Sequence, residues 1–201
     1  APFAHGGDVS IQAATKYIVG HSDVMLGTIT TTEACFLRAK RASSLLGMAA
    51  GPDDCYLALR GLRTLPVRLA RHEQTALTLA HWLKARPEVA RVLHPALPDC
   101  PGHNFWRRDF SGSNGLLSVV LHDVPKPALA AMLDGLELFA MGYSWGGYES
   151  LVVPFEPRHA RTATAWTASG PCLRLHCGLE DPGDLIADLD AGFARLAAAV
   201  P

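Results

Sequence analysis

A long amphipathic helix is expected over residues 64–85. Apolar side chains recur there on one helix face, at Leu65, Leu69, Ala76, Leu79, Ala80 and Leu83. This spacing is typical of an α-helix that buries one side. Pro66 lies in the first turn of the expected helix, where the missing N–H of a proline costs nothing. A helix of this length is long enough to link two lobes of one chain.

Short strands and helices alternate on both sides of this helix. Strand-like runs lie at 8–13, 24–30, 89–93, 116–121, 138–140, 151–153 and 173–176. Further helices are expected over 53–61 and 128–133, from Asp181-Pro182 onwards, and from a capping box at Thr30 and Glu33 to Met48. A loop rich in Pro and Gly is expected after residue 93, to about Gly102. The alternation predicts an α/β fold.

The composition excludes several classes of protein. The 201 residues include 18 Lys and Arg against 19 Asp and Glu, so there is no basic excess to bind nucleic acid. No apolar run approaches the roughly 18 residues of a membrane span. Five cysteines, without a C-x-x-C pair, argue against a metal site or a disulfide framework and favour a cytoplasmic location. With 49% hydrophobic residues, the chain is expected to oligomerise or to pack against more protein.

Lys16 has surroundings that differ from those of the other lysines. It follows an apolar strand and precedes Tyr17-Ile18-Val19, whereas Lys40, Lys84 and Lys126 lie among polar or helical residues. Desolvation lowers the pKa of a lysine. A neutral amine is what a Schiff-base lysine needs to attack a carbonyl, as in pyridoxal phosphate (PLP) enzymes. The alternative is a strand-end lysine whose ammonium group reaches water, and position alone favours that alternative.

Two further segments contain candidate site residues. Arg174 lies in the alternating run 172–177, and an arginine that faces a cavity can bind a carboxylate through two parallel hydrogen bonds. An ion-paired arginine on an edge strand is an equal alternative. Residues 142–146 match the G-x-S-x-G motif of serine hydrolases, with Ser144 as nucleophile. That motif needs a helix after the serine, but a β-branched run and Pro154 follow here, so a hydrolase is disfavoured.

Separated segments of the chain, in the same order, resemble the Cys/Met-metabolism family of PLP enzymes. They are Ser10-Ile11-Gln12-Ala13-Ala14-Thr15-Lys16-Tyr17 with Gly20-His21-Ser22-Asp23, Arg60-Gly61-Leu62-Arg63-Thr64-Leu65, Tyr143-Ser144-Trp145-Gly146-Gly147-Tyr148-Glu149-Ser150-Leu151, and Arg174-Leu175-His176 with Gly178-Leu179-Glu180-Asp181. The third segment, with the first, is similar to the branch that cleaves cystathionine by β-elimination. The γ-synthase and γ-lyase branches carry a Ser where Ala13 stands. The resemblance runs along essentially the whole chain and overturns the preference for a solvated Lys16.

The resemblance implies a fold-type I, PLP-dependent transferase-like fold, and a homotetramer with active sites between subunits. Lys16 would bind PLP covalently and remove the Cα proton of the substrate, and Thr15 would contact the cofactor phosphate. Arg174 would bind the substrate α-carboxylate.

Residues of the third segment would complete this site. Ser144 and Trp145 would help to bind the carboxylate, Ser144 would also orient the Lys16 amine, and Tyr143 would line the pocket. The implied reaction is that of a carbon–sulfur lyase of methionine biosynthesis, which converts cystathionine to homocysteine, pyruvate and ammonia.

The resemblance also implies two domains. Residues 1–62 would end the PLP-binding domain, and residues 63–201 would form the C-terminal domain. The family's acidic partner of the pyridine nitrogen, its ring-stacking aromatic residue and its phosphate loop all lie earlier than Ala1. We therefore expect a C-terminal portion that needs the N-terminal half and is inactive alone. A fragment that only oligomerises is the non-catalytic alternative.

Overall fold

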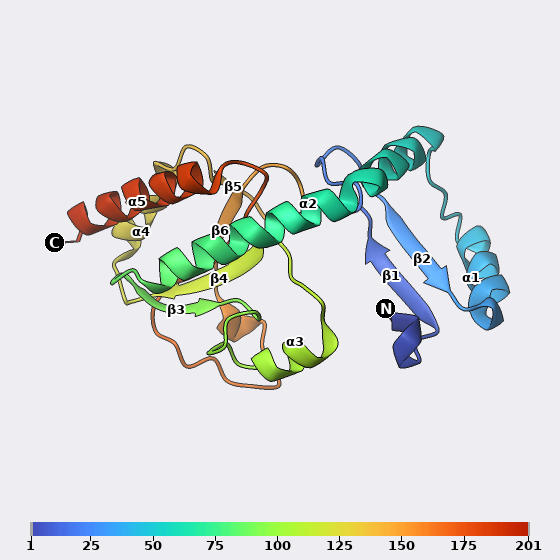
Figure 1. The fold of residues 1–201 in the computed structure, drawn as a ribbon, viewed down its shortest axis with the longest axis horizontal. Coiled ribbons are helices and arrows are strands. Elements are labelled where there is room, and N and C mark those ends of the chain that lie inside the picture. Colours follow the sequence, from blue (N-terminus) through green and yellow to red (C-terminus); the bar gives the residue numbers. More distant parts are fainter. Residues whose placement is uncertain (1, 201) are drawn as a thin grey trace. The chain divides into compact units, whose positions relative to one another are not determined.

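The computed structural model describes residues 2–200 and divides the chain into two compact units, Ala1–Pro66 and Val67–Pro201 (Figure 1). The boundary falls inside helix α2 (Pro52–Lys84), so each unit contains part of that helix. Both units combine helices with β-sheet, as the alternating pattern predicts. The interpretation of residues 1–62 and 63–201 as a cofactor domain and a C-terminal domain stays a prediction.

Unit 1 is built on a two-stranded antiparallel sheet. Strand β1 (Val9–Ala13) pairs with β2 (Gly27–Thr31), and the turn that contains Lys16 lies between the two strands. A short 3-10 helix, η1 (Pro2–His5), precedes β1, and helix α1 (Glu33–Leu45) follows β2. The two predicted strands are confirmed, although β2 starts three residues later than the pattern 24–30 indicates.

The expected capping box at Thr30 is wrong. Thr30 lies within β2, opposite Ser10, and the residue that precedes α1 is Thr32. The Thr32 side chain does not cap the helix, and its hydroxyl lies 3.4 Å from a carboxylate oxygen of Asp8. A residue in the middle of a paired strand cannot also be a helix N-cap, because its backbone belongs to the sheet.

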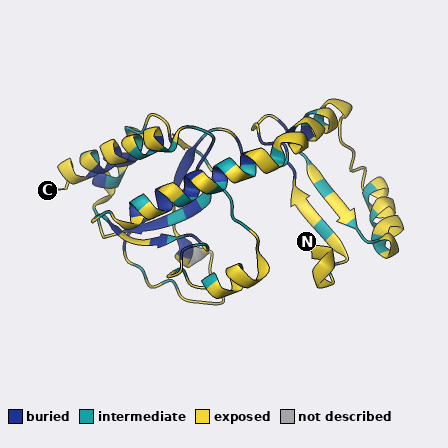
Figure 2. Cartoon of the chain, in the orientation of Figure 1, coloured by how far each residue is buried: buried dark blue, intermediate teal, exposed yellow. Residues whose placement is uncertain are grey.

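Most apolar side chains of unit 1 are exposed. Its small core consists of Val19, Val24 and Ala58, with Leu26 and Leu57 packed against them. Helix α1 has no buried residue, and β1, β2 and α1 are drawn mostly in the colour of exposed residues (Figure 2). The most exposed large apolar side chains are Met25 at 88%, Leu37 and Leu45 at 77% each, and Ile11 at 74%. This sheet and this helix therefore have apolar surface that unit 1 does not itself bury.

Helix α2 is continuous, whereas the sequence predicts separate helices over 53–61 and 64–85. Pro66 lies inside it rather than in its first turn. A proline in a helix interior removes its own hydrogen bond to the carbonyl four residues earlier and clashes with that carbonyl, at a cost of about 3 kcal/mol. Apolar residues are buried on both sides of Pro66, with Ala58 on one side and Leu79 on the other. Burial of both halves stabilises the helix across the proline.

Unit 2 contains a five-stranded sheet in the order β3-β4-β7-β6-β5. The strands are β3 (Val89–Leu93), β4 (Leu116–Leu121), β5 (Ala140–Met141), β6 (Leu151–Phe155) and β7 (Cys172–His176). The pair β5–β6 is parallel and the other pairs are antiparallel. Four of the five predicted strands are confirmed to within two residues, whereas the strand expected over 138–140 starts only at Ala140. Strand β7 is the central strand, which decides the position of Arg174.

The core of unit 2 lies between this sheet and three helices. Helices α4 (Lys126–Asp134) and α5 (Pro182–Ala198) and the C-terminal part of α2 contribute to one apolar cluster with the strands. Asp181 begins α5 as an N-cap whose side chain accepts a hydrogen bond from Gly183. Helix α3 (His103–Asp109) was not predicted, because it is short and has no buried residue to produce a helical period. A 3-10 helix, η2 (Pro157–His159), precedes β7.

Neither a membrane-spanning helix nor a cluster of metal-ligating side chains is found among the residues that the structure describes. Within residues 2–200, no helix is both long enough and apolar enough to cross a membrane. Over the same range, His, Cys, Asp and Glu side chains do not gather in threes as a metal ion would require.

Candidate functional site

Lys16 lies in a tight turn directly after β1. Its N–H donates to the carbonyl of Ala13 at 3.1 Å, and its carbonyl accepts from the N–H of Gly20 at 2.8 Å. The N–H of Val19 closes the same turn on the carbonyl of Ala14 at 2.9 Å. The Lys16 residue is half-buried. Its backbone is therefore held on both sides, while the side chain leaves a fixed point of unit 1.

Thr15 fastens this turn to the start of β2. Its hydroxyl accepts from the N–H of Leu26 at 2.8 Å and lies 3.2 Å from the carbonyl of Leu26, to which it donates. The Thr15 N–H donates to the same carbonyl at 3.0 Å. A hydroxyl has one proton to donate, and Leu26 receives it. The expected phosphate contact of Thr15 stays a prediction, and the structure gives this residue a structural role besides.

Gly61 lets helix α2 approach the Lys16 turn closely. A Cβ atom at this position would overlap the carbonyl oxygens of Ile18 and Val19. Only a glycine leaves room for those carbonyls, so the helix and the turn are packed backbone to backbone. This contact lies within unit 1 and fixes the direction in which the turn presents Lys16.

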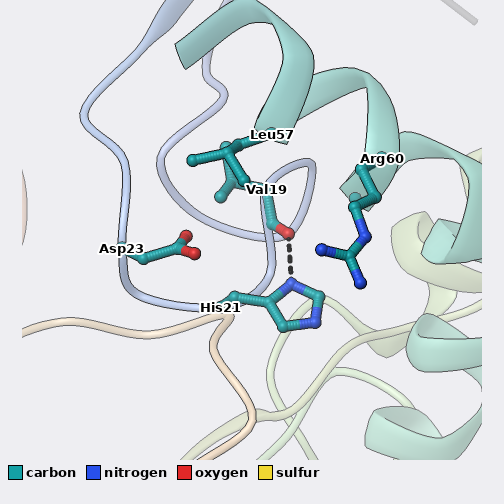
Figure 3. Close-up of a pocket in the computed structure, with 6 residues that line it drawn as sticks. Val19, His21, Asp23, Leu57 and Arg60 are labelled. Carbon is teal, nitrogen blue, oxygen red and sulfur yellow. Dashed lines mark hydrogen bonds between the residues drawn. The ribbon is translucent and has the colours of Figure 1, made fainter. Parts of the chain in front are cut away.

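A small cavity lies beside the same turn (Figure 3). It has a volume of about 90 Å³ and is lined by Val19, His21, Asp23, Leu57, Arg60 and Gly61. His21 donates from Nδ1 to the carbonyl of Val19 at 2.8 Å. Ligand pockets usually have at least roughly 300 Å³, so this cavity is too small for a cofactor. We interpret its residues as the support of the turn.

Arg174 lies on the central strand of unit 2, between Ser118 of β4 and Val153 of β6. The reading as an edge-strand arginine is therefore wrong. Nη2 of Arg174 donates to the carbonyl of Tyr143 at 2.6 Å, and the guanidinium lies over the Trp145 ring, 5.3 Å from its centroid. Among residues 2–200, no carboxylate forms an ion pair with Arg174. An oriented, half-buried guanidinium of this kind can bind an external carboxylate.

The loop between β5 and β6 contains the other three predicted residues of unit 2. Tyr143 is 78% exposed, and the group through which it contacts Arg174 is its carbonyl. Ser144 and Trp145 are half-buried. Residue 151 starts strand β6, so the turn after Ser144 does not lead into a helix as the serine-hydrolase motif requires. The structure thus brings Tyr143, Ser144 and Trp145 together around Arg174.

His176 and Glu180 hold this loop, and the sequence analysis places both in segments that resemble the family without giving either a role. Nε2 of His176 lies 3.0 Å from the N–H of Gly146. The carboxylate of Glu180 accepts from the Ser150 N–H at 2.7 Å and from the Ser150 hydroxyl at 2.8 Å. His176 shares one face of β7 with Arg174, because alternate residues of a strand point the same way. That alternation, together with the resembling segment Arg174-Leu175-His176, is the signal in the sequence that points to His176.

Burial is the main cause of the pKa shifts of three ionisable groups near this loop. It lowers the pKa of His176 to about 4, against a partial opposing effect of the backbone hydrogen bond to Gly147. Burial also lowers the pKa of His72, which donates from Nδ1 to the carbonyl of Cys177 at 2.7 Å. Burial raises the pKa of the Cys177 thiol. Both histidines are therefore neutral near pH 7, and Cys177 is no nucleophile.

The residues present fit PLP at the lysine. A primary amine on a rigid turn is the group that condenses with an aldehyde, and the chemistry and the firm placement of Lys16 meet that need. The Thr15 hydroxyl fits less well as a phosphate donor, since it already donates to Leu26.

Comparisons with known proteins decide the family. The model of the family "Cys/Met metabolism PLP-dependent enzyme" matches residues 1–194. The chain belongs to this family. It is 52% identical to the cystathionine beta-lyase MetC of Escherichia coli over 195 residues, which are 95% of this chain and 49% of that protein. The family's cofactor is pyridoxal phosphate.

Other members of the family differ in their reactions. An L-alanine/L-glutamate racemase of Wolbachia pipientis is 41% identical over 97% of this chain and 49% of its own length. The crystal structure of cystathionine gamma synthase from Xanthomonas oryzae pv. oryzae in complex with cystathionine matches with a TM-score of 0.89 and 35% identity, over 99% of this chain and 53% of that one. This match confirms the fold-type I expectation. The chain spans about half the length of the curated relatives it matches.

Proposed function

We propose that this chain is the lysine- and carboxylate-binding portion of a PLP-dependent carbon–sulfur β-lyase. The substrate would be cystathionine, and the products would be homocysteine, pyruvate and ammonia. The observation that carries the proposal is the geometry of Arg174, which is fixed on a central strand by a carbonyl and an indole ring. Such an arginine recognises the one group that all α-amino acids share besides the amine.

Each unit supplies one part of the proposed chemistry. In unit 1, Lys16 binds the cofactor covalently and afterwards, as a neutral amine, takes the proton from Cα of the substrate. In unit 2, Arg174 binds the α-carboxylate, and the Trp145 ring holds the guanidinium by a cation–π contact. PLP, when bound, supplies an electron sink for the pair of electrons that remains on Cα.

The atom balance of the proposed reaction determines its products. The Cα–H bond breaks first, and the Cβ–S bond breaks next, so that homocysteine leaves as a thiol. One water molecule then hydrolyses the remaining three-carbon fragment to pyruvate and ammonia. No oxidant or reductant is needed.

The 52% identity to a cystathionine beta-lyase favours this reaction over racemisation. A racemase returns the proton to Cα, whereas a β-lyase releases the group on Cβ. Incubation of the full-length enzyme with cystathionine is expected to release pyruvate and free thiol in equal amounts. Formation of D-alanine from L-alanine, without pyruvate from cystathionine, would replace the lyase by a racemase.

Borohydride trapping tests the role of Lys16 directly. PLP is added, the sample is reduced, and the labelled peptide is identified by mass spectrometry. The adduct is expected at Lys16 and not at Lys40, Lys84 or Lys126, and Lys16→Arg is expected to abolish it. No adduct at Lys16 in the full-length enzyme would refute the proposal.

The proposal includes the need for an N-terminal half and a homotetrameric assembly. The apolar surface that unit 1 leaves exposed supports this need (Figure 2). This chain alone is therefore expected to give little adduct and no turnover, and addition of the N-terminal half is expected to restore both. A chain that assembles with that half and still fails to bind PLP would be the non-catalytic alternative.

The serine-hydrolase alternative has its own test. Ser144 is followed by a strand, so we expect no labelling by a fluorophosphonate. Covalent labelling of Ser144 would favour a hydrolase.

A further inference from the structure

The segment 174–180 holds the loop 143–150 at three points. Arg174 donates to the carbonyl of Tyr143 at the start of the loop. His176 bonds its middle, and Glu180 bonds its end at Ser150. The three contacts lie within unit 2, and each joins two segments about 30 residues apart in sequence.

The middle contact fixes the residue after Trp145. The N–H of Gly146 points at Nε2 of His176 at 3.0 Å, and the carbonyl of Gly147 lies 3.2 Å from the same nitrogen. In either ring tautomer, Nε2 can therefore bond one of these two backbone groups. Gly146 has φ +84°, a left-handed conformation that few other residues adopt. The His176 imidazole is 1% exposed and so has little freedom to move.

The end contact is a closed network rather than a single bond. Ser150 donates its N–H and its hydroxyl to the two carboxylate oxygens of Glu180. The Ser150 hydroxyl in turn accepts from the N–H of Gly178 at 2.8 Å, and the N–H of Leu179 donates to the carbonyl of Tyr148 at 2.8 Å. Hydrogen bonds to a charged carboxylate are worth about 1.5–3 kcal/mol each.

The loop in turn orients Arg174. The groups that fix the guanidinium are the Tyr143 carbonyl, the Ser144 carbonyl at 3.5 Å and the Trp145 ring, and all belong to the loop. The hydrogen bonds of His176 and Glu180 to the loop end on Gly146 and Ser150, so we expect their effect on binding to pass through the loop.

We propose that His176 and Glu180 are positioning residues, which set the affinity for a carboxylate ligand by fixing loop 143–150 around Arg174. This inference rests on the proposed function for the identity of the ligand, an α-amino acid. It adds two residues to the site and assigns them specificity for the carboxylate.

A matched pair of substitutions tests the end contact. Glu73 on α2 accepts the N–H and the hydroxyl of Ser113 on one carboxylate oxygen, at 2.8 and 3.1 Å, whereas Glu180 accepts those of Ser150 on both of its oxygens. Glu180→Gln and Glu73→Gln each remove the charge of a carboxylate that accepts from a serine, and only the first acts on loop 143–150. Glu180→Gln also replaces one of the two acceptor oxygens by a donor. For the middle contact, His176→Leu removes the bond, His176→Gln keeps a polar group near Nε2, and His103→Leu on α3 is the control.

The readouts are amide hydrogen exchange of residues 142–150 in the full-length protein and calorimetric affinities for L-alanine and L-alaninamide. We expect Glu180→Gln and His176→Leu to raise exchange at Ser150 and Gly146, respectively, and to weaken L-alanine binding about tenfold. This is near the upper limit for one neutral hydrogen bond and the lower limit for one to a charged group. Binding of L-alaninamide is expected to change less than twofold. His176→Gln should recover most of the L-alanine affinity, and both controls should behave like the parent protein.

Two results would overturn the inference. One is faster exchange in the loop with an unchanged preference for the acid over the amide, which would leave His176 and Glu180 a merely structural role. The other is unchanged exchange in both variants. Borohydride labelling of Lys16 in the same variants is expected to persist, and its loss in the parent protein would refute the proposed function while leaving the exchange result valid.

Discussion

Thr15 and Leu26 are joined by hydrogen bonds in both directions, through the Thr15 hydroxyl and through both backbone groups of Leu26. The residue beside the candidate cofactor lysine is thus tied to the residue that directly precedes β2. Its hydroxyl proton is engaged with protein, so stability and cofactor binding can be separated at this position.

Thr15→Val is expected to destabilise the protein by about 1–3 kcal/mol, because a half-buried N–H loses its acceptor. Thermal unfolding of the full-length protein, with and without PLP, measures the effect. Thr30→Val, an exposed position of β2, serves as the control. An equal loss with and without PLP shows a structural role alone, whereas a larger loss with PLP shows the phosphate contact as well.

Gly61→Ala is expected to destabilise the protein although alanine favours helices by about 1 kcal/mol over glycine. The new methyl group would overlap two backbone carbonyls of the Lys16 turn, and such overpacking costs typically 1–3 kcal/mol or more. Gly192→Ala in α5 is the comparison, since the nearest atom there is a movable side-chain carbon of Leu136 at 3.1 Å. Chemical denaturation of both variants checks the contrast. Equal stability would refute the close packing at Gly61.

Arg174→Lys is expected to raise KM for cystathionine roughly 10- to 150-fold, with a smaller change in kcat. The lysine keeps the charge but loses the second of two parallel hydrogen bonds, and a charge-assisted bond is worth about 1.5–3 kcal/mol. Steady-state kinetics of the full-length enzyme measure the split. A loss confined to kcat would show that Arg174 does not bind the ground-state carboxylate.

His176 is expected to make stability depend on pH between about 4 and 6.5. The unfolded chain binds a proton at this residue below about pH 6.5, but the folded chain binds it only below about 4. Stability is therefore full above that window and falls as the pH falls through it, by about 3 kcal/mol for the whole shift. His72 and Arg174 are the charged or titratable groups that face His176.

Urea unfolding between pH 4 and 7.5 measures this dependence. His72 and His94 have pKa values lowered in the same direction and contribute to the slope of the parent protein. His176→Gln is expected to show a flatter profile, because one of the three groups is gone. An identical slope would contradict the neutral, buried state of His176.

The sequence patterns predicted the presence of helices and strands better than the residues at which they begin and end. Apolar runs and alternation located the strands of both sheets, most accurately β3 and β4, whose buried residues pack in the core of unit 2, and least accurately the exposed β5. The same patterns split helix α2 in two, since propensity rules treat Pro66 as a boundary and cannot weigh the burial on both sides of it. They also misplaced the N-cap at Thr30, whose strand pairing depends on a residue 20 positions earlier.

The sequence and the structure also contribute different information about the candidate site. The resemblance singled out Lys16 and Arg174 by motif, and the structure adds what holds them. The residues around Lys16 and Arg174 are held by backbone groups and by residues distant in sequence. Thr15, for example, bonds to Leu26, and Ser150 bonds to Glu180. A single sequence records which side chains are present but not which carbonyl lies within 3 Å of them.

Helix α2 has a consequence for any attempt to prepare the two units separately. Their boundary, between Pro66 and Val67, lies in the interior of a helix and not in a linker. A helix end leaves four N–H or four C=O groups without partners. A cut at this peptide bond would therefore break the helical hydrogen bonds that cross it and create two frayed termini at once. The natural places to divide the chain are the loops at either end of α2, and the helix itself is expected to resist proteolysis while the fold is intact.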